Sequence, residues 1–449
     1  MRARIGRLQN TFFLKVKLTT VFTSVLLGGV MAGSFLPNAW TQDIGQADRA
    51  PRWLYESEIC GMYFTADPMS PEQVQQYAAF PLVIWGQPAT HVQQIKALHK
   101  RGVRSLAYVS FYKAPDIRRT EDRRHWQGGS PGVIECKKNP FWRTVNRARH
   151  PEWTLIGEDG SVKRPFDNPN YPPGWDQVCT NVKGYPEAVL KGVRQVMDMG
   201  FDGLFIDNVH PSECFGPQHG AHRHIHPELS NAESYKLLLA RVRQLVKRYG
   251  DDKVCILNSG DPIKDYGPYG DALMWEHYPN TEASQGWDSA RQGIEQWLAY
   301  VHSGKQILGL THAGFGLPPT TPPGDSSYFS YACAKLAGFL WANDPLRIGP
   351  IRIGMPIDTI RAANGVQYRL YEHGLVAVNT EDEERSVEIP VGSAYAEVRD
   401  VSSGQALQQH DGLLSLRIPS GSGRVYVAPP KPAARASATS SDVHVNPTP

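Results

Sequence analysis

The sequence predicts an α/β protein in which a (β/α)8 TIM-type barrel is followed by a small antiparallel β-sandwich. Strand-like and helix-like runs alternate over residues 55–350, and such alternation implies a parallel sheet covered by helices. From about residue 355 the chain changes to short runs in which apolar and polar residues alternate, which is typical of an antiparallel sheet. No GxGxxG or Walker loop follows an early strand, which disfavours a doubly wound sheet.

Seven barrel strands are predicted from their apolar runs. They lie at 58–64, 81–86, 103–112, 202–207, 253–259, 271–278 and 305–313. The eighth strand is weak, and we expect it near 345–353 or an incomplete barrel. Helices are predicted between the strands from apolar residues at helical spacing, at 71–80, 91–102, 186–200, 232–250, 288–303 and 326–342.

The domain organisation follows from these patterns and from composition. We expect an export signal at 1–39 and a linker at 40–54. The catalytic barrel is expected at 55–350, with a long irregular loop at 113–185. The β-sandwich at 351–428 and a disordered tail at 429–449 follow. The tail lacks an apolar pattern and is rich in Pro, Ala and Ser, a composition that cannot bury a core.

The N-terminus resembles an export signal. Basic residues precede the uncharged run "LTTVFTSVLLGGVMAGSFL", and small residues near Ala39 offer a cleavage site. We therefore expect an exported protein, either secreted or held in the periplasm or cell envelope. If the signal is cleaved, no stable membrane insertion remains; an uncleaved membrane anchor is the alternative.

Composition limits the function classes. Of 449 residues, 41% are hydrophobic and 20% charged, which predicts a mostly globular chain. The net charge is only +3 and no basic stretch is interleaved with aromatics, so no nucleic-acid partner is expected. Eleven Trp and nineteen Tyr fit either core packing or platforms that stack on sugar rings.

The cysteines show no redox or zinc-ribbon motif, because no two have CxxC spacing. Three of them lie in predicted strands or a predicted helix, where a buried free thiol is expected; these are Cys60, Cys255 and Cys333. The other three lie in predicted loops, where one disulfide of unknown pairing is allowed; these are Cys136, Cys179 and Cys214.

Two acids directly end apolar strands, Asp207 in "LFIDN" and Glu276 in "ALMWEHY". Barrel enzymes carry their chemistry at these strand ends, and two carboxylates facing one pocket are what glycosidic cleavage requires. The alternatives are structural: Asp207 as the N-cap of a helix and Glu276 as a buried salt-bridge partner. Asp202, which precedes the same strand as Asp207, suits a turn.

Other strand-end residues are predicted to bind substrate. Amides and an imidazole can bond sugar hydroxyls and aromatic rings can stack on sugars; the candidates are Tyr63, Trp85, Tyr112, Asn208, Asn258, Tyr278 and His312. The loop 113–185 either covers the site or is a packed decoration; its tryptophans are Trp126, Trp142, Trp153 and Trp175.

The loop "HGAHRHIHPE" holds four histidines, His219, His222, His224 and His226. Alternate residues share one face of an extended segment, which would permit chelation. No carboxylate joins them at a recognised metal spacing, so we favour a solvated loop and predict no metal and no cofactor. A contact between one of these histidines and the substrate is the intermediate possibility.

Four stretches of the sequence look familiar. "HPEWTLIGEDG", "VCTNVKGYPEAVLKGVRQVMDMGFDGLFIDN", "LNSG" and "MWEHY" resemble glycoside hydrolases of the α-amylase/α-galactosidase-like (β/α)8 barrel superfamily, and "GLVAVNT" is similar to the β-domain that follows such barrels. The resemblance implies a nucleophile at the end of strand four and an acid/base at the end of strand six, here Asp207 and Glu276. Many α-galactosidase-like relatives carry Asp as the acid/base, so Glu276 departs from that pattern.

These observations predict an exported glycosidase that cleaves O-glycosidic bonds of an oligo- or polysaccharide by a retaining mechanism. Asp207 would form a covalent glycosyl-enzyme, and Glu276 would first protonate the leaving oxygen and then deprotonate water. Two alternatives stay open. One is a catalytically silent carbohydrate-binding or cell-surface protein; the other is a metal-dependent polysaccharide deacetylase that uses the histidine cluster.

Overall fold

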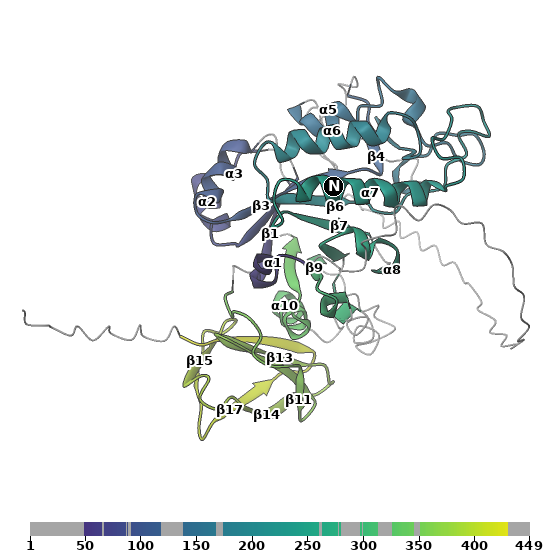
Figure 1. Ribbon diagram of the computed structural model, residues 1–449. Coiled ribbons are helices and arrows are strands. Elements are labelled where there is room, and N and C mark those ends of the chain that lie inside the picture. The colour runs from purple at the N-terminus through teal and green to yellow at the C-terminus, as the bar shows by residue number, and fades with distance from the viewer. Residues whose placement is uncertain are drawn as a thin grey trace, which may run out of the picture. The chain divides into compact units, whose positions relative to one another are not determined.

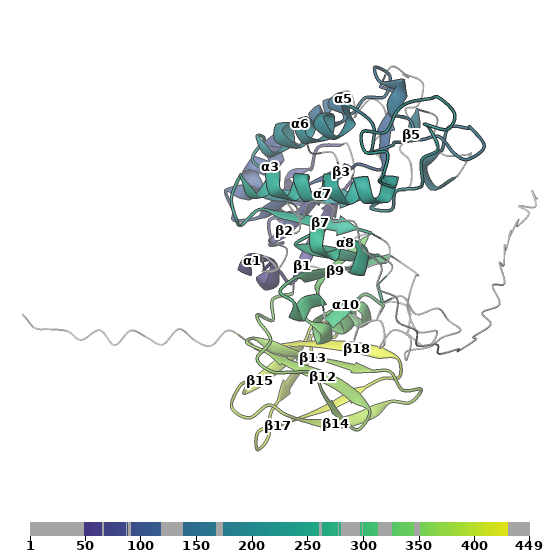
Figure 2. The same cartoon turned by 45° about the vertical axis from the view of Figure 1, so that its right-hand side comes forward.

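Eight parallel strands close into a barrel in the computed structural model (Figures 1 and 2). The structure describes residues 49–64, 67–86, 88, 91–117, 138–167, 174–259, 263–276, 278–279, 297–298, 300–312, 326–344 and 351–429. Around the barrel the strands follow the order β1-β10-β9-β8-β7-β6-β3-β2. Their bounds are β1 Ile59–Tyr63, β2 Leu82–Trp85, β3 Arg104–Ser110, β6 Gly203–Asp207, β7 Val254–Asn258, β8 Ala272–Glu276, β9 Gln306–His312 and β10 Leu340–Asp344.

The predicted fold class is confirmed, but the eighth strand was misplaced. It is β10, not a segment near 345–353, and it closes the barrel between β9 and β1. The apolar run at its start looks like a continuation of the preceding helix. That helix instead ends at Ala337, because Gly338 adopts a left-handed φ of 76° that glycine tolerates best.

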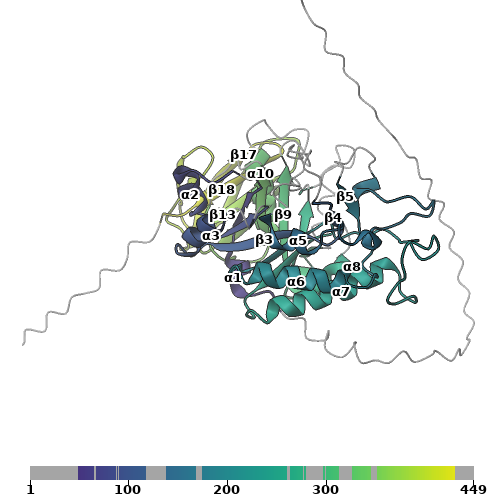
Figure 3. The ribbon, with the colours of Figure 1, turned by 90° about the horizontal axis from the view of Figure 1, so that it is seen from above.

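Helices pack around the outside of the barrel. Their bounds, with the short 3-10 turns, are α1 Arg52–Glu56, α2 Pro71–Tyr77, α3 Val92–His99, α5 Pro140–Thr144, η1 Pro151–Trp153, η2 Pro165–Asp167, α6 Tyr185–Met197, α7 Asn231–Lys247, α8 Ile263–Tyr266, η3 Gly267–Tyr269 and α10 Ser326–Ala337. Capping boxes start α2 at Ser70 and α7 at Ser230, satisfying backbone N–H groups that a helix leaves unpaired. In all three ribbon views α6 and α7 lie side by side (Figure 3).

The segment between β3 and α6 buries its described tryptophans. A two-stranded antiparallel ribbon, β4 Lys113–Pro115 and β5 Trp175–Gln177, follows β3 directly. Trp142, Trp153 and Trp175 are buried, with at most 2% of each residue exposed. These rings are therefore part of the core and offer no platform to a ligand, while Trp126 lies outside the described residues.

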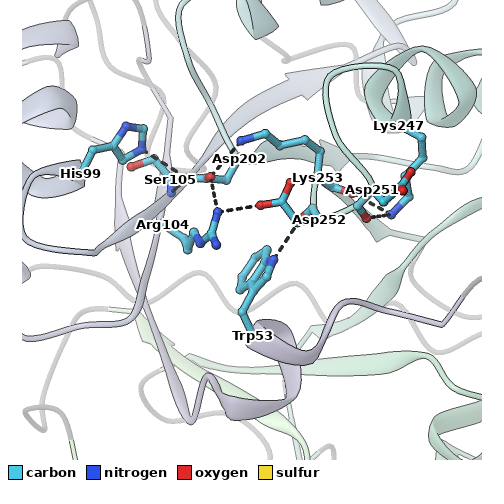
Figure 4. A network of polar contacts seen from close by, with 9 residues as sticks. All are labelled: Trp53, His99, Arg104, Ser105, Asp202, Lys247, Asp251, Asp252 and Lys253. Atoms are coloured by element: carbon cyan, nitrogen blue, oxygen red, sulfur yellow. Dashed lines mark hydrogen bonds and ion pairs between the residues drawn. The ribbon is translucent and has the colours of Figure 1, made fainter.

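Charged clusters tie together the N-terminal ends of the strands. Asp202, just before β6, accepts hydrogen bonds from Arg104 (2.8 Å), Lys253 (3.1 Å) and the backbone N–H of Ser105 (2.9 Å) (Figure 4). His99 Nε2 lies 3.2 Å from the same carboxylate. Burial alone would raise the pKa of Asp202, but these donors hold it well below its usual range. Asp202, which was predicted to lie in a turn, is thus the centre of a charged cluster at the N-terminal end of the barrel. We call this end the barrel floor.

The C-terminal strands form a β-sandwich. A six-stranded sheet runs in the order β11-β12-β13-β18-β15-β16, and β14 and β17 form a second sheet. Their bounds are β11 Arg361–Ala363, β12 Val366–Tyr371, β13 Gly374–Asn379, β14 Arg385–Pro390, β15 Glu397–Asp400, β16 Ala406–Gln408, β17 Leu413–Ile418 and β18 Ser422–Val427. Leu375 of β13 and Ile389 of β14 belong to one apolar cluster, so the sheets pack face to face.

The other face of the six-stranded sheet packs on the barrel helix α10 (Figure 2). Val376 and Val378 of β13 belong to the barrel core, whereas Leu375 and Ala377 belong to the sandwich core. This division follows the alternation of side chains along a strand. It explains why "GLVAVN" is apolar at nearly every position and why β13 is buried on both faces.

The predicted export signal 1–39 and all but the first residue of the predicted tail 429–449 lie outside the described residues. The end of the predicted linker 40–54 differs from expectation: Leu54 is buried in the barrel core and belongs to α1. No helix among the described residues is long and apolar enough to cross a membrane. The cysteines within this part of the chain are free, including Cys179 and Cys214; Cys136 lies outside it.

Candidate active site

The two strand-end acids meet at the same end of the barrel. Asp207 is the last residue of β6 and Glu276 the last residue of β8. Strand β7 lies between them in the sheet and ends at Asn258. Because all three strands are parallel, their last side chains collect at the C-terminal face, where barrel enzymes carry their active sites.

One amide joins both carboxylates. Asn258 Nδ2 donates to Asp207 Oδ1 at 2.9 Å and to Glu276 Oε2 at 2.9 Å. Asn258 itself is 8% exposed, and both acids are half-buried. A nitrogen with two hydrogens can serve two acceptors at once, so this side chain sets the distance between the acids. The two predicted catalytic residues therefore share one site.

The second oxygen of Asp207 is also fixed. Oδ2 accepts from Tyr108 Oη at 2.6 Å and from Asn208 Nδ2 at 2.5 Å. A carboxylate is an acceptor-only group, and here a hydroxyl and two amides supply it with donors. Locked from three sides, Asp207 has the defined orientation that a reacting group needs.

The backbone turns sharply just after Asp207. Asn208 adopts a left-handed φ of 58°, a conformation that asparagine accepts more readily than most residues. The next N–H, of Val209, then donates to the carbonyl of Asn258 at 2.9 Å. This turn attaches the loop after β6 to the end of β7 and explains why no helix follows Asp207 immediately.

Two aromatic rings group around His210, on which the charges of both acids act. The His210 ring lies edge-on to Tyr112, with centroids 4.7 Å apart, and to Phe166, 5.7 Å apart. Desolvation lowers the pKa of His210 more than the charges of Asp207 and Glu276 raise it, which favours the neutral imidazole. The Phe166 ring is 52% exposed and presents an apolar surface next to the polar centre.

The structure separates the predicted substrate-binding residues. Asn208 and Asn258 contact the carboxylates and Tyr112 contacts His210. Trp85 and Tyr278 are fully buried, and Tyr63 is 5% exposed with its hydroxyl bonded to the carbonyl of Asp67. We therefore assign none of these three rings to sugar stacking. They fill the barrel core, where apolar area is worth most. The side chain of His312 lies outside the described part of the structure.

Sequence reasoning missed Tyr108, His210 and Phe166. Tyr108 lies two residues before the end of β3, and its long side chain carries the hydroxyl up to Asp207 although its register partner is Phe205. The period of two along β3 placed Tyr108 on the same face as Ser110 and was an available signal. Phe166 lies in an irregular segment with a φ of 58°, and no sequence pattern identified it.

The histidine-rich loop does not behave as one unit. His219 Nε2 contacts the carbonyl of Glu158 at 2.9 Å, and His226 lies 3.5 Å from Glu228 on the surface. His222 and His224 instead face two cysteines, Cys214 and Cys179. The interpretation as a uniformly solvated loop therefore fails for two of the four histidines. Their thiol neighbours were not considered as partners.

Comparison with known proteins identifies the family of this chain. Residues 124–375 match the family described as "Hypothetical glycosyl hydrolase family 15". The chain belongs to this family. The predicted enzyme class, a glycosidase, agrees with the family's description. No curated protein matches the sequence closely enough to be counted as a relative.

Solved structures show the same fold at low sequence identity. The α-amylase from Geobacillus thermoleovorans complexed with acarbose is 9% identical, with a TM-score of 0.51, and covers 85% of this chain and 100% of its own. Amy13B of Eubacterium rectale is 10% identical, with a TM-score of 0.50, covering 88% of this chain and 100% of its own. These similarities support the barrel and sandwich architecture of this family member.

Proposed function

We propose that this family member is an exported, retaining glycosidase that hydrolyses O-glycosidic bonds in an oligo- or polysaccharide. The observation that carries the proposal is the amide of Asn258, which donates to both Asp207 and Glu276. Two carboxyl groups bonded to one side chain at the C-terminal end of the barrel, the barrel mouth, support joint action on a single glycosidic bond.

The spacing of the acids favours retention. Each bond from Asn258 Nδ2 is 2.9 Å long, so the two bonded oxygens lie within twice that length of each other. The two hydrogens of an amide nitrogen diverge by about 120°, which corresponds to oxygens about 5 Å apart. Retaining enzymes hold their carboxyl groups about 5–5.5 Å apart, whereas inverting enzymes need about 6.5–9.5 Å to admit a water.

The two acids take different parts. Asp207, held by three donors, attacks the anomeric carbon while the bond to the leaving oxygen breaks and Glu276 gives that oxygen its proton. Water then attacks the glycosyl-enzyme, Glu276 takes the proton from the water, and Asp207 is released as a carboxylate. This assignment also follows the resemblance, in which the nucleophile ends strand four and the acid/base ends strand six.

The rings beside the acids suit a sugar. Phe166 offers an exposed apolar ring, and a neutral His210 can both donate and accept a hydrogen bond with a hydroxyl. Tyr112 supports both, since its hydroxyl accepts from the backbone N–H of Phe166 at 2.8 Å. We propose these residues as the wall of the first sugar-binding position.

Export is the part of the proposal that rests on the N-terminal sequence alone. The uncharged run after the basic residues suits a signal that is removed near Ala39. The mass of the chain recovered from the periplasm or the culture medium tests this directly. A full-length chain found only in the cytoplasm would contradict it.

A covalent trap tests the mechanism. A panel of 2-deoxy-2-fluoro glycosides with dinitrophenyl or fluoride leaving groups, in both anomeric forms, is incubated with the enzyme and the digest is analysed by mass spectrometry. We expect one sugar to remain attached to Asp207, and no label on Asp207→Asn. Asp202→Asn, which changes the other end of the same strand, is the matched control and should still be labelled. Label on a different residue would contradict the retaining assignment. A product whose anomeric configuration is opposite to that of the substrate in an NMR time course would also contradict it.

A further inference from the structure

Four side chains of types that bind metals converge at the histidine-rich loop, and neither Asp207 nor Glu276 is one of them. This Cys2His2 cluster consists of Cys179, Cys214, His222 and His224, and one ligand atom from each lies within 4.8 Å of all the others. Cys179 Sγ is 3.5 Å from His224 Nε2, and Cys214 Sγ is 3.4 Å from His222 Nε2. Two sulfurs and two imidazole nitrogens therefore surround one point.

These distances fit tetrahedral zinc. With Zn–S of about 2.3 Å and Zn–N of about 2.0–2.1 Å, a tetrahedral centre requires sulfur and nitrogen ligands about 3.5 Å apart. The two measured separations, 3.5 and 3.4 Å, agree with that requirement. The ligand set is also one that zinc prefers, since structural zinc sites are commonly built from two cysteines and two histidines.

The surrounding chain holds the ligands in place. The side chain of Asn181 is buried and its Nδ2 donates to the carbonyl of His226 at 2.7 Å. The backbone of Ile225 donates to the carbonyl of Asn181 at 2.8 Å, and Val182 and His224 form a β-bridge. These bonds tie the segment after β5 to the loop after β6, on each side of the cluster.

One further detail concerns the space around a ligand. Gly216 lies against the His222 ring so closely that a Cβ there would come within 2.2 Å of Cε1. The loop therefore leaves room for the imidazole only because residue 216 has no side chain.

We propose that Cys179, Cys214, His222 and His224 bind one zinc ion, which fastens the loop after β6 to the segment after β5. Four protein ligands fill a tetrahedral zinc and leave no open position for water or substrate. The ion is therefore structural, and the metal-dependent deacetylase considered from the sequence loses its basis. Because Asp207 and His210 lie at the start of the fastened loop, the zinc holds one wall of the active site.

Two other states of the cluster compete with zinc. Thiol–imidazole hydrogen bonds alone would leave two reactive cysteines, and oxidation would join Cys179 to Cys214 as a disulfide. Each state has its own signature, so the proposal can be tested without knowing the glycan substrate. Its outcome is independent of the glycosidase mechanism.

The test uses the full chain, purified without chelators and without a histidine tag. Elemental analysis should give about one zinc per chain, and cobalt substitution should give the intense visible bands and sulfur-to-metal charge transfer of a tetrahedral thiolate site. Cys214→Ser and His224→Gln should each lower zinc occupancy at least tenfold. His219→Gln and His226→Gln, in the same loop but outside the cluster, are the matched controls and should keep it.

A wild-type measurement decides the matter if the ligand variants do not fold. With metal bound, Cys179 and Cys214 should resist alkylation, and a chelator should expose both together in a peptide map. A zinc content below one tenth per chain after incubation with zinc, equal alkylation with and without chelator, or a Cys179–Cys214 disulfide in the non-reduced map would each overturn the proposal.

Discussion

The two ends of strands β6 and β8 carry acids with opposite surroundings. At the N-terminal ends, Asp202 and Asp271 lie among basic side chains: Arg104 and Lys253 bind the first, Arg243 and Lys247 the second. At the C-terminal ends, Asp207 and Glu276 receive the neutral amide of Asn258. On each strand the two acids are five positions apart, Asp202 and Asp207 on β6 and Asp271 and Glu276 on β8.

At the barrel floor, Asp202 and Asp271 make the same kind of hydrogen bond to a neighbouring strand. Asp202 accepts from the backbone N–H of Ser105 on β3, and Asp271 accepts from that of Cys255 on β7, each at the start of the neighbouring strand. A charge that is fully paired contributes to stability, but its interactions are already satisfied within the protein and it is not available to a substrate. A carboxylate held by neutral donors keeps its charge available. We propose that the same residue type serves the fold at one end and chemistry at the other, as expected for a barrel.

The sharpest way to test this contrast is Asp207→Asn. We expect turnover to fall about 10⁴-fold, because the nucleophile is lost while the shape of the site is kept. The unfolding temperature should change by no more than about 2 °C, since no ion pair is removed. Initial rates on the hydrolysed glycan and a thermal melt give both numbers. A variant that keeps a tenth of its activity would contradict the assigned role.

Glu276→Gln separates acid from nucleophile. A general acid contributes about 10²–10⁴-fold, so hydrolysis of a natural glycan should fall about 10³-fold. Substrates with a dinitrophenol leaving group need no protonation, and their glycosylation step should be nearly unchanged. Pre-steady-state bursts of dinitrophenol measure that step. An equal loss for both kinds of substrate would argue against Glu276 as the proton donor.

Asn258→Ala removes the link between the acids. Loss of one aligned donor at a reacting centre costs about 10²-fold, and the two acids would then lose the amide that links them. We expect turnover to fall by that amount while substrate affinity changes little. Asn139→Ala, a helix cap remote from the site, is the control for general damage and should leave kcat within twofold.

Replacing Asp202 or Asp271 at the barrel floor should lower stability and leave activity nearly unchanged. Asp202→Asn leaves Arg104 and Lys253 without their shared partner, and partial exposure of Arg104 moderates the cost to about 2 kcal/mol. Because Asp271 is fully buried, its replacement by Asn should lower the free energy of unfolding by about 3 kcal/mol. Urea unfolding followed by Trp fluorescence measures both, and kcat should stay within threefold. A loss of activity without a loss of stability would break the comparison.

The effect of acid follows from the pKa of Asp202. Because the fold lowers that pKa, the carboxylate stabilises the protein fully above its unfolded pKa of about 3.9. The contribution is lost as the pH falls below that value toward the lower, folded pKa. Unfolding free energies of wild type and Asp202→Asn should therefore converge between about pH 4 and pH 2. A constant gap over this range would exclude titration of Asp202 as the cause.

Most of the barrel could be predicted from the sequence because each strand is an apolar run between helix signals. Strand β10 was misplaced since Gly338 ends a helix whose apolar pattern continues into the strand. The acids at positions 207 and 276 were found because an ionisable residue at the end of a buried strand is costly unless it is used. Neither the prediction of the barrel strands nor that of the two acids required the structure of the loops.

The remaining site residues depend on contacts across the fold. Tyr108 reaches Asp207 by the length of its side chain and not by strand-end position. The Cys2His2 cluster joins Cys179 to His224, 45 residues away in sequence, so no local spacing could reveal it. Trp85 and Tyr278 were misread because a strand-end aromatic ring is as useful to the core as to a ligand, and only packing decides between them.

The most direct test of the contrast between floor and mouth compares Asp202→Asn with Asp207→Asn, the same substitution at the two ends of one strand. Turnover and unfolding free energy are measured for both variants and the wild type under identical conditions. The account predicts a stable, inactive Asp207→Asn and an active, destabilised Asp202→Asn. An Asp207→Asn enzyme that still turns over, or an Asp202→Asn enzyme that is inactive but as stable as wild type, would contradict it.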